Sequence, residues 1–171
     1  QLELFDLVRI DHFRGLDACW MIPADKETAM HGHWEDTPGE ELLSALFTRF
    51  QDLPLVAEDL GVITDRVIAL KEAFGLPGMK VLVSGLVGAG SARMYLPQAY
   101  VANSLAETGT HATNTVKGWC ENERTDEHRQ RLLSYLRREV ASETVNWDFI
   151  QMVMNSVADT AIIPMQDILG L

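Results

Sequence analysis

The amino-acid sequence predicts an α/β fold with a parallel sheet, arranged as part of a (β/α)8 TIM barrel. Short apolar runs alternate with longer segments of helical period, which indicates strands joined by helical crossovers. The apolar runs are nearly continuous, as is typical of strands buried on both faces. Polar side chains follow four of these runs, at the strand ends where barrel enzymes carry their active sites: Asp11, Glu58, His111 and Asp167. A doubly wound sheet would alternate in the same way, but the chain contains no G-x-G-x-x-G or P-loop segment to hold a phosphate.

The predicted elements alternate in order along the chain. Residues 40–50 (EELLSALFTRF) have apolar side chains at helical spacing, and Pro38-Gly39 marks the start of that helix. Thr64 is placed to cap the next helix. Apolar runs predict strands at residues 5–11, 55–58, 79–84, 107–110 and 160–164, and helical patterns follow at 65–74, 125–139 and 146–157. Five strands make only part of an eight-stranded barrel.

Composition narrows the class of protein. A length of 171 residues with 47% hydrophobic side chains fits one globular domain, so residues 1–171 are expected to form a single domain, the partial barrel described above. The net charge of −11 argues against binding to a nucleic-acid backbone. No apolar run approaches the roughly 20 residues of a membrane span. Cys19 and Cys120 form no metal-type pair and indicate reduced thiols in a cytoplasmic protein. Neither a metal nor a cofactor is expected.

Two strand ends carry the most informative residues. The segment Val8–Gly15 (VRIDHFRG) runs from an apolar strand into a carboxylate, an imidazole and an arginine. The segment Leu53–Gly61 (LPLVAEDLG) repeats this design with Glu58 and Asp59. Two carboxylates at the ends of two parallel strands suggest acid/base or nucleophilic chemistry on a sugar or a phosphate.

Motifs along nearly the whole chain resemble the 4-alpha-glucanotransferases, the amylomaltases or disproportionating enzymes of glycoside hydrolase family 77. Their order and spacing make the resemblance highly specific. The motifs are RIDHFRG (9–15), WMIPA (20–24), PGE (38–40), AEDLG (57–61), LPGMKVL (76–82), GTH (109–111) and SVADTAIIPMQD (156–167). The resemblance implies a longer (β/α)8 barrel, of which this chain would supply roughly strand 4 to strand 8 without the N-terminal strands.

The resemblance also implies the roles of individual residues. Asp11 would be the nucleophile of a retaining double displacement, and Glu58 the general acid and base. Arg9 would orient Asp11, because the two side chains share one face of a strand. The family's substrates imply an α-1,4-glucan or malto-oligosaccharide as donor and acceptor, with sugar contacts from His12, His111 and Asp167. Asp59 is expected to be a structural hydrogen-bond partner. The expected location is the cytoplasm, or the plastid for a plant source.

This chain departs from the family pattern at its third site. The family has Gly-Thr-His-Asp, whereas Ala112 follows His111 here. A methyl group cannot accept the sugar hydroxyl bonds that tighten in the transition state, which typically costs about 10²-fold or more in rate. Val83-Ser84-Gly85 stands where the family often has Gln-Phe, and Tyr95–Tyr100 lacks the family's His and Asn. An engineered variant, a diverged pseudoenzyme and an imperfect gene fragment are three open explanations.

Three functions fit these observations. The first is the catalytic core of a glucanotransferase, impaired by Ala112 and by the missing strands. The second is a non-catalytic or degenerate glucan-binding protein on the same scaffold. The third is another α-glucan hydrolase of the same clan, to which the motifs at 20–24 and 76–80 are poorly suited.

Overall fold

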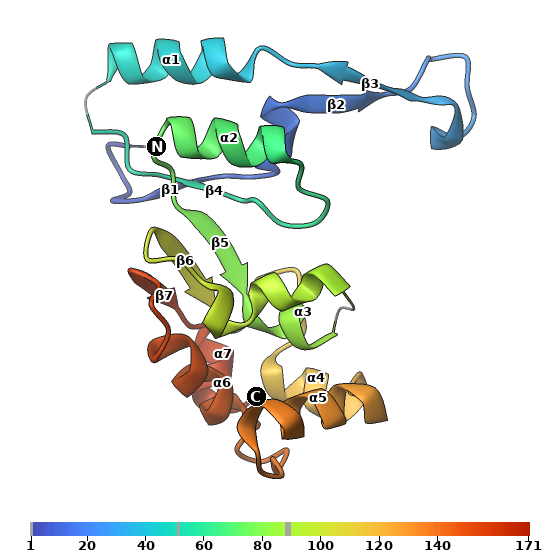
Figure 1. The fold of residues 1–171 in the computed structure, drawn as a ribbon, viewed down its shortest axis with the longest axis vertical. Helices are drawn as coiled ribbons and strands as arrows, with labels where there is room; N and C mark the ends of the chain where they lie inside the picture. The colour runs from blue at the N-terminus through green and yellow to red at the C-terminus, as the bar shows by residue number, and fades with distance from the viewer. Residues whose placement is uncertain (1, 51, 88–89) are drawn as a thin grey trace. The chain divides into compact units, whose positions relative to one another are not determined.

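The computed structural model describes residues 2–50, 52–87 and 90–171. The chain divides into two compact units, residues 1–78 and 79–171, which are described one at a time below. The strands of the main sheet follow the order β1-β4-β5-β6-β7 (Figure 1). Their pairs β1/β4, β4/β5 and β6/β7 are parallel. This mixed α/β architecture with a mostly parallel sheet confirms the predicted fold class. The strands are β1 (Val8–Ile10), β4 (Leu55–Ala57), β5 (Gly78–Val81), β6 (Ser104–Glu107) and β7 (Thr160–Ile162).

The first unit packs two helices against the β1/β4 pair. These are α1 (Gly39–Arg49) and α2 (Asp65–Ala73). The Thr64 side chain caps α2 as predicted, accepting a hydrogen bond from the backbone N–H of Val67 at 3.4 Å. Both helices and β4 contribute side chains to one buried hydrophobic cluster, which packs the helices against the strands. The cluster consists of Phe13, Leu43, Leu55, Ala57, Val67 and Leu76.

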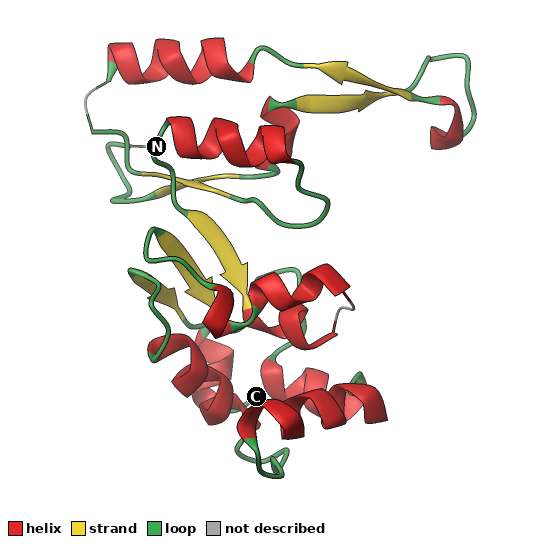
Figure 2. Ribbon diagram, in the orientation of Figure 1, coloured by secondary structure: helices red, strands yellow, loops and turns green. Residues whose placement is uncertain are grey.

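A β-hairpin absent from the sequence prediction also belongs to the first unit. Its strands are β2 (Ala18–Met21) and β3 (His33–Asp36), which pair antiparallel with Trp20 opposite Trp34. Short 3-10 turns precede and interrupt it at Phe13–Leu16 and Ala29–His31. The two strands extend beyond α1 and α2 (Figure 2).

The second unit combines β6, β7 and β5 from Met79 onward with helices. In chain order the helices are α3 (Leu82–Val87), α4 (Val116–Asn122), α5 (Asp126–Leu136), α6 (Val145–Met154) and α7 (Met165–Leu169), with 3-10 turns at Gly90–Tyr95 and Pro97–Ala99. Thr115 caps α4, and Thr125 forms a capping box with His128 on α5. Leu82, Trp119 and Phe149 are among the most deeply buried side chains of this unit.

Several boundaries differ from the prediction. The predicted strand 79–84 ends at Val81, and Leu82 begins α3. A continuous apolar run does not distinguish a buried strand from a buried helix, which explains this error. The strand expected at 107–110 lies instead at Ser104–Glu107. The prediction that both faces of the strands are buried holds for β4, β5 and β6 but is wrong for β1 and β7, which end the sheet order.

Candidate functional site

The β1/β4 pair sets the positions of the two predicted catalytic carboxylates. Ile10 is in register with Ala57, so Asp11 and Glu58 are the next residues at the same edge of the pair. Two backbone hydrogen bonds fix this edge: the Glu58 N–H donates to the Ile10 carbonyl at 3.0 Å, and the Phe13 N–H donates to the Glu58 carbonyl at 3.0 Å. Residues 47 positions apart in sequence (58 − 11) therefore start from adjacent backbone positions.

The Glu58 carboxylate is buried and held by backbone donors. Glu58 is 8% exposed. Oε2 accepts the N–H of His12 at 2.7 Å, and Oε1 accepts the N–H of Leu60 at 3.1 Å. His12 has a left-handed backbone (φ 47°), which is uncommon for a residue other than glycine. This conformation bends the turn after Asp11 so that the backbone N–H of His12 donates to the Glu58 carboxylate.

Asp11 has a different environment. Its side chain is 76% exposed, and its Oδ1 pairs with the Arg9 guanidinium at 2.5 Å. The predicted strand 5–11 ends at Ile10, so Asp11 is the first residue after β1, and the ion pair brings its side chain to that of Arg9 on the strand. The Asp11 carboxylate is therefore open to solvent on one side and held by a guanidinium on the other.

Asp59 is a structural residue, as predicted. Its Oδ2 accepts a hydrogen bond from Lys71 on α2 at 2.6 Å, and both side chains are largely buried. A Cβ on Gly78 would lie 2.3 Å from that Asp59 oxygen, so the glycine leaves room for the ion pair. This pair fastens α2 to the strand end that carries Glu58.

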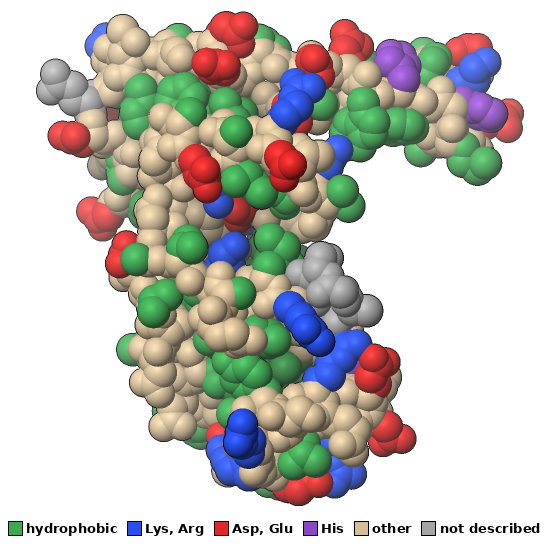
Figure 3. Space-filling view, viewed as in Figure 1, with side chains coloured by type: hydrophobic (Ala, Val, Ile, Leu, Met, Phe, Trp, Pro, Cys, Tyr) green, Lys and Arg blue, Asp and Glu red, His purple; other side chains and the backbone are tan. Residues whose placement is uncertain are grey.

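The hairpin carries an exposed aromatic pair beside the same strand end. Trp20 and Trp34 are 40% and 52% exposed and meet edge to face, with ring centroids 5.3 Å apart. The Arg14 guanidinium, three residues after Asp11, lies 4.1 Å from the centroid of the Trp34 ring. Hydrophobic side chains gather over this hairpin near histidines (Figure 3). The sequence contained the tryptophans, but it gave no signal of the strand pairing that brings them together.

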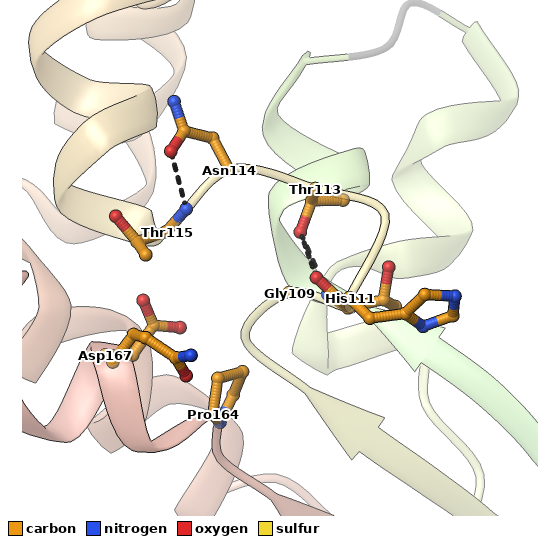
Figure 4. Close-up of a pocket in the computed structure, with 9 residues that line it drawn as sticks. Gly109, His111, Thr113, Asn114, Thr115, Pro164 and Asp167 are labelled. Atoms are coloured by element: carbon orange, nitrogen blue, oxygen red, sulfur yellow. Dashed lines mark hydrogen bonds between the residues drawn. The ribbon is translucent and has the colours of Figure 1, made fainter.

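In the second unit, His111 and Asp167 line one cavity of about 300 Å³. The loop of residues 109–115 forms one side of this cavity, and Pro164, Gln166 and Asp167 contribute the other (Figure 4). The loop is stiffened by Thr113, whose hydroxyl accepts from the Thr110 N–H at 2.9 Å and donates to the Thr110 carbonyl at 3.0 Å. Most of the residues that line the cavity have polar side chains, the His111 imidazole among them, which suits a hydroxylated ligand.

The Asp167 carboxylate in this cavity wall is bonded mainly to other groups of the protein. It is 2% exposed, and both of its carboxylate oxygens accept hydrogen bonds from the protein, from Thr108 and from Val116. Thr108 was not identified from the sequence as a site residue. Direct contact between Asp167 and a sugar stays a prediction.

Ala112 opens onto a neighbouring cavity of about 500 Å³. Val83, Ser84 and Trp119 also line it. Val83, Ser84 and Ala112, the positions at which the sequence analysis noted departures from the resembled motifs, therefore line one cavity. The lining residues supply one exposed carboxylate, Glu123, which hydrogen-bonds to Asn114 at 2.9 Å.

The structure therefore groups the predicted residues into two sets. Arg9, Asp11, His12 and Glu58 lie together in the first unit, and His111, Ala112 and Asp167 lie together in the second. Among the described residues, no helix is long and apolar enough to cross a bilayer.

Comparison with known proteins points to one family. A family model described as 4-alpha-glucanotransferase matches residues 1–171. The chain is 43% identical over 170 residues to a 4-alpha-glucanotransferase of Aquifex aeolicus, covering 99% of this chain and 34% of the relative. It is 44% identical over 178 residues to that of Thermus thermophilus, covering 99% and 35%. A chloroplastic/amyloplastic 4-alpha-glucanotransferase of Arabidopsis thaliana is 40% identical over 170 residues, covering 99% and 29%.

Solved structures agree. The amylomaltase of Streptococcus agalactiae in complex with acarbose superposes with a TM-score of 0.88 at 34% identity, over 98% of this chain and 34% of that one. The amylomaltase of Corynebacterium glutamicum, at 15% identity and a TM-score of 0.68, shares the fold. The chain spans about a third of the length of the curated relatives it matches.

Proposed function

Because the chain belongs to the 4-alpha-glucanotransferase family, glycoside hydrolase family 77, we propose that it forms the catalytic segment of a retaining 4-alpha-glucanotransferase. Its substrates would be α-1,4-glucans or malto-oligosaccharides, which serve as both donor and acceptor. The observation that carries this proposal is the register of β1 with β4, which starts Asp11 and Glu58 from adjacent backbone positions. The acarbose complex of the Streptococcus agalactiae amylomaltase supports an oligosaccharide ligand. A cytoplasmic location is part of the same proposal.

The proposed reaction has two displacements. In the first, an Asp11 carboxylate oxygen attacks the anomeric carbon and the glycosidic C–O bond breaks, while Glu58 gives its proton to the leaving oxygen. In the second, Glu58 takes a proton from the 4-hydroxyl of the acceptor sugar. That oxygen attacks the anomeric carbon and releases Asp11. Retention requires the two carboxyl groups to lie about 5–5.5 Å apart in the complex.

The surroundings of the carboxylates divide the work between them. Arg9 orients the exposed Asp11 toward an incoming sugar. The backbone N–H groups of His12 and Leu60 fix the buried Glu58. On the loop of the second unit, His111 would contact sugar hydroxyls. Ala112 lacks the acceptor oxygens of the family's carboxylate, so transfer by this chain should be impaired.

A chimera tests this proposal without the complication of length. Residues 1–171 replace the corresponding third of the Thermus thermophilus relative, and maltotriose disproportionation is followed by thin-layer chromatography. With Ala112 we expect a faint ladder of shorter and longer glucans. Ala112→Asp should raise the rate by about 10²-fold or more. Glu58→Gln in the Ala112→Asp chimera is the matched control and should abolish the ladder.

The outcomes separate the proposal from its alternative. A folded Ala112→Asp chimera without transfer would refute the catalytic assignment. Ala112 itself favours that alternative, a non-catalytic glucan-binding protein on the same scaffold. This alternative predicts that the chain binds maltoheptaose in calorimetry and that no variant produces a ladder of glucans.

A further inference from the structure

One buried carboxylate holds both ends of the loop that bears His111 and Ala112. The loop, residues 109–115, leaves the sheet after Thr108 and ends where α4 begins at Val116. The Thr108 hydroxyl donates to Asp167 Oδ2 at 2.5 Å. The Val116 N–H donates to Asp167 Oδ1 at 2.8 Å. Asp167 lies 51 residues beyond Val116, on α7.

The contacts around this carboxylate are closed to solvent. Asp167 is 2% exposed, Thr108 0% and Val116 1%. Asn146 on α6 secures Asp167 from behind, donating its side-chain N–H to the Asp167 carbonyl at 2.7 Å.

Further bonds tie α7 to the same loop end. The Thr115 hydroxyl donates to the Leu171 carbonyl at 2.6 Å, and Lys117 donates to the Gly170 carbonyl at 2.9 Å. The Asp167 carboxylate therefore lies inside a set of hydrogen bonds that hold the end of the loop, and not on the surface of the loop.

We propose that Asp167 is a positioning residue, which sets the place of His111 and of position 112 by clamping both ends of their loop. In Figure 4 the His111 ring extends away from Asp167, on the other side of the loop. The carboxylate thus acts on the sugar site through the backbone it holds. This inference deepens the proposed function, and its consequence for sugar binding rests on that function.

Thr108 separates positioning from direct sugar contact. Since Thr108 is fully buried, it cannot touch a ligand, yet it holds one of the two clamp bonds. Thr108→Val removes that bond and keeps the carboxylate, whereas Thr108→Ser keeps the hydroxyl. If Asp167 acts by positioning, Thr108→Val should reproduce the effect of Asp167→Ala, and Thr108→Ser should not.

The experiment is amide hydrogen exchange of the 171-residue chain, read by NMR, for the parent and for Asp167→Ala, Asp167→Asn, Thr108→Val and Thr108→Ser. Loss of a buried hydrogen bond should speed exchange in residues 109–115 by about tenfold in Asp167→Ala and Thr108→Val. Exchange in β4 of the other unit is the internal reference and should not change. Asp167→Asn can still accept from Val116 and donate to Thr108, so it should stay within about threefold of the parent.

Two results would overturn the clamp. One is unchanged exchange in the loop when Thr108→Val is folded. The other is an equal rise in exchange throughout the second unit, which would make Asp167 a general stabiliser of the fold. Acarbose binding, measured on the same variants, should weaken in Asp167→Ala and Thr108→Val together. If the parent chain binds no acarbose, the proposed function is weakened, while the exchange result still decides the clamp.

Discussion

At the scale of single residues, the carboxylates of Glu58 and Asp11 in the first unit have different surroundings. Glu58 is buried, and two backbone N–H groups bind its oxygens. Asp11 is exposed and pairs with one guanidinium. An exposed ion pair contributes little to folding, typically about 0–1 kcal/mol. The Arg9–Asp11 contact is therefore expected to add little to the free energy of unfolding.

Tyr100 gives the chain a predictable response to alkaline pH. Burial, and then the nearby Tyr135, raise the pKa of Tyr100 above its usual value of 10.0, and its hydroxyl donates to the Tyr95 carbonyl at 2.9 Å. Above pH 10 the unfolded chain loses a proton that the folded chain keeps. The free energy of unfolding should therefore fall by about 1.4 kcal/mol for this group between pH 8 and pH 11.

Urea unfolding of Tyr100→Phe checks this effect. Loss of the hydrogen bond should cost about 1 kcal/mol at pH 8. At pH 11 the variant should match or exceed the parent, because it has no phenol to titrate. Tyr135→Phe is the matched control. Burial also raises the pKa of Tyr135, but Tyr135 is less deeply buried, so we expect a smaller effect. An equal pH dependence in the parent and in Tyr100→Phe would contradict the assignment.

At the scale of elements, the hairpin depends on one glycine. The Trp20 indole N–H donates to the Ala29 carbonyl at 2.8 Å, and the ring lies against Gly32. A Cβ on Gly32 would come within 2.2 Å of the Trp20 indole nitrogen and 2.8 Å of the Met21 carbonyl oxygen. Gly32→Ala must therefore displace the ring or the backbone. We expect a cost of about 1–3 kcal/mol, as for other overpacked sites.

The indole N–H signals in a ¹H–¹⁵N spectrum report this displacement. In Gly32→Ala the Trp20 signal should move or broaden, and the Trp34 signal should follow through the ring contact. Gly15→Ala is the control in the same unit, because its added Cβ would meet only the His12 ring, at an ordinary 3.5 Å. Unshifted indole signals in Gly32→Ala would show that the Trp20 ring is not held in this position.

Local sequence predicted the elements only where its signals are unambiguous. The strand ends at Asp11 and Glu58 could be predicted, because an apolar run followed by polar residues has one reading in a parallel sheet. The α2 cap at Thr64 could be predicted because it rests on a short-range bond. The apolar run at 79–84 could not be divided between strand and helix, since both are buried.

The elements that were missed depend on contacts between distant residues. The hairpin strands are joined by 11 residues (32 − 22 + 1), without the two-residue turn that marks a hairpin in sequence. Helix α7 has only five residues. The bond from Thr108 to Asp167 joins residues 59 positions apart, so spacing gives no indication of it. Sequence could therefore predict that Asp11 and Glu58 follow adjacent strands, but not the bonds by which Asp167 on α7 holds the two ends of one loop.

At the scale of the whole molecule, surface composition predicts self-association. Ile162 is 45% exposed and lies in β7, a strand at one end of the sheet order. Every residue of β7 is exposed. Leu4 and Phe5 are 79% and 56% exposed just before β1, the strand at the other end. End strands with apolar side chains are templates for pairing with another chain. The net charge of −11 opposes this association, and salt screens that repulsion.

Light scattering after size exclusion tests this at protein concentrations from about 1 to about 100 μM, the range in which exposed apolar surface drives assembly. The mean mass should rise with concentration, and rise further with added sodium chloride. Ile162→Lys should lower it by placing a charge on the end strand. Val157→Lys is the matched control, because Val157 is 61% exposed, lies outside the strands and makes the same change in charge. Each lysine makes the net charge of −11 less negative, so an equal rise in the mass of both variants would show that net charge rather than the β7 edge governs association. A monomer at every concentration and salt would refute the prediction.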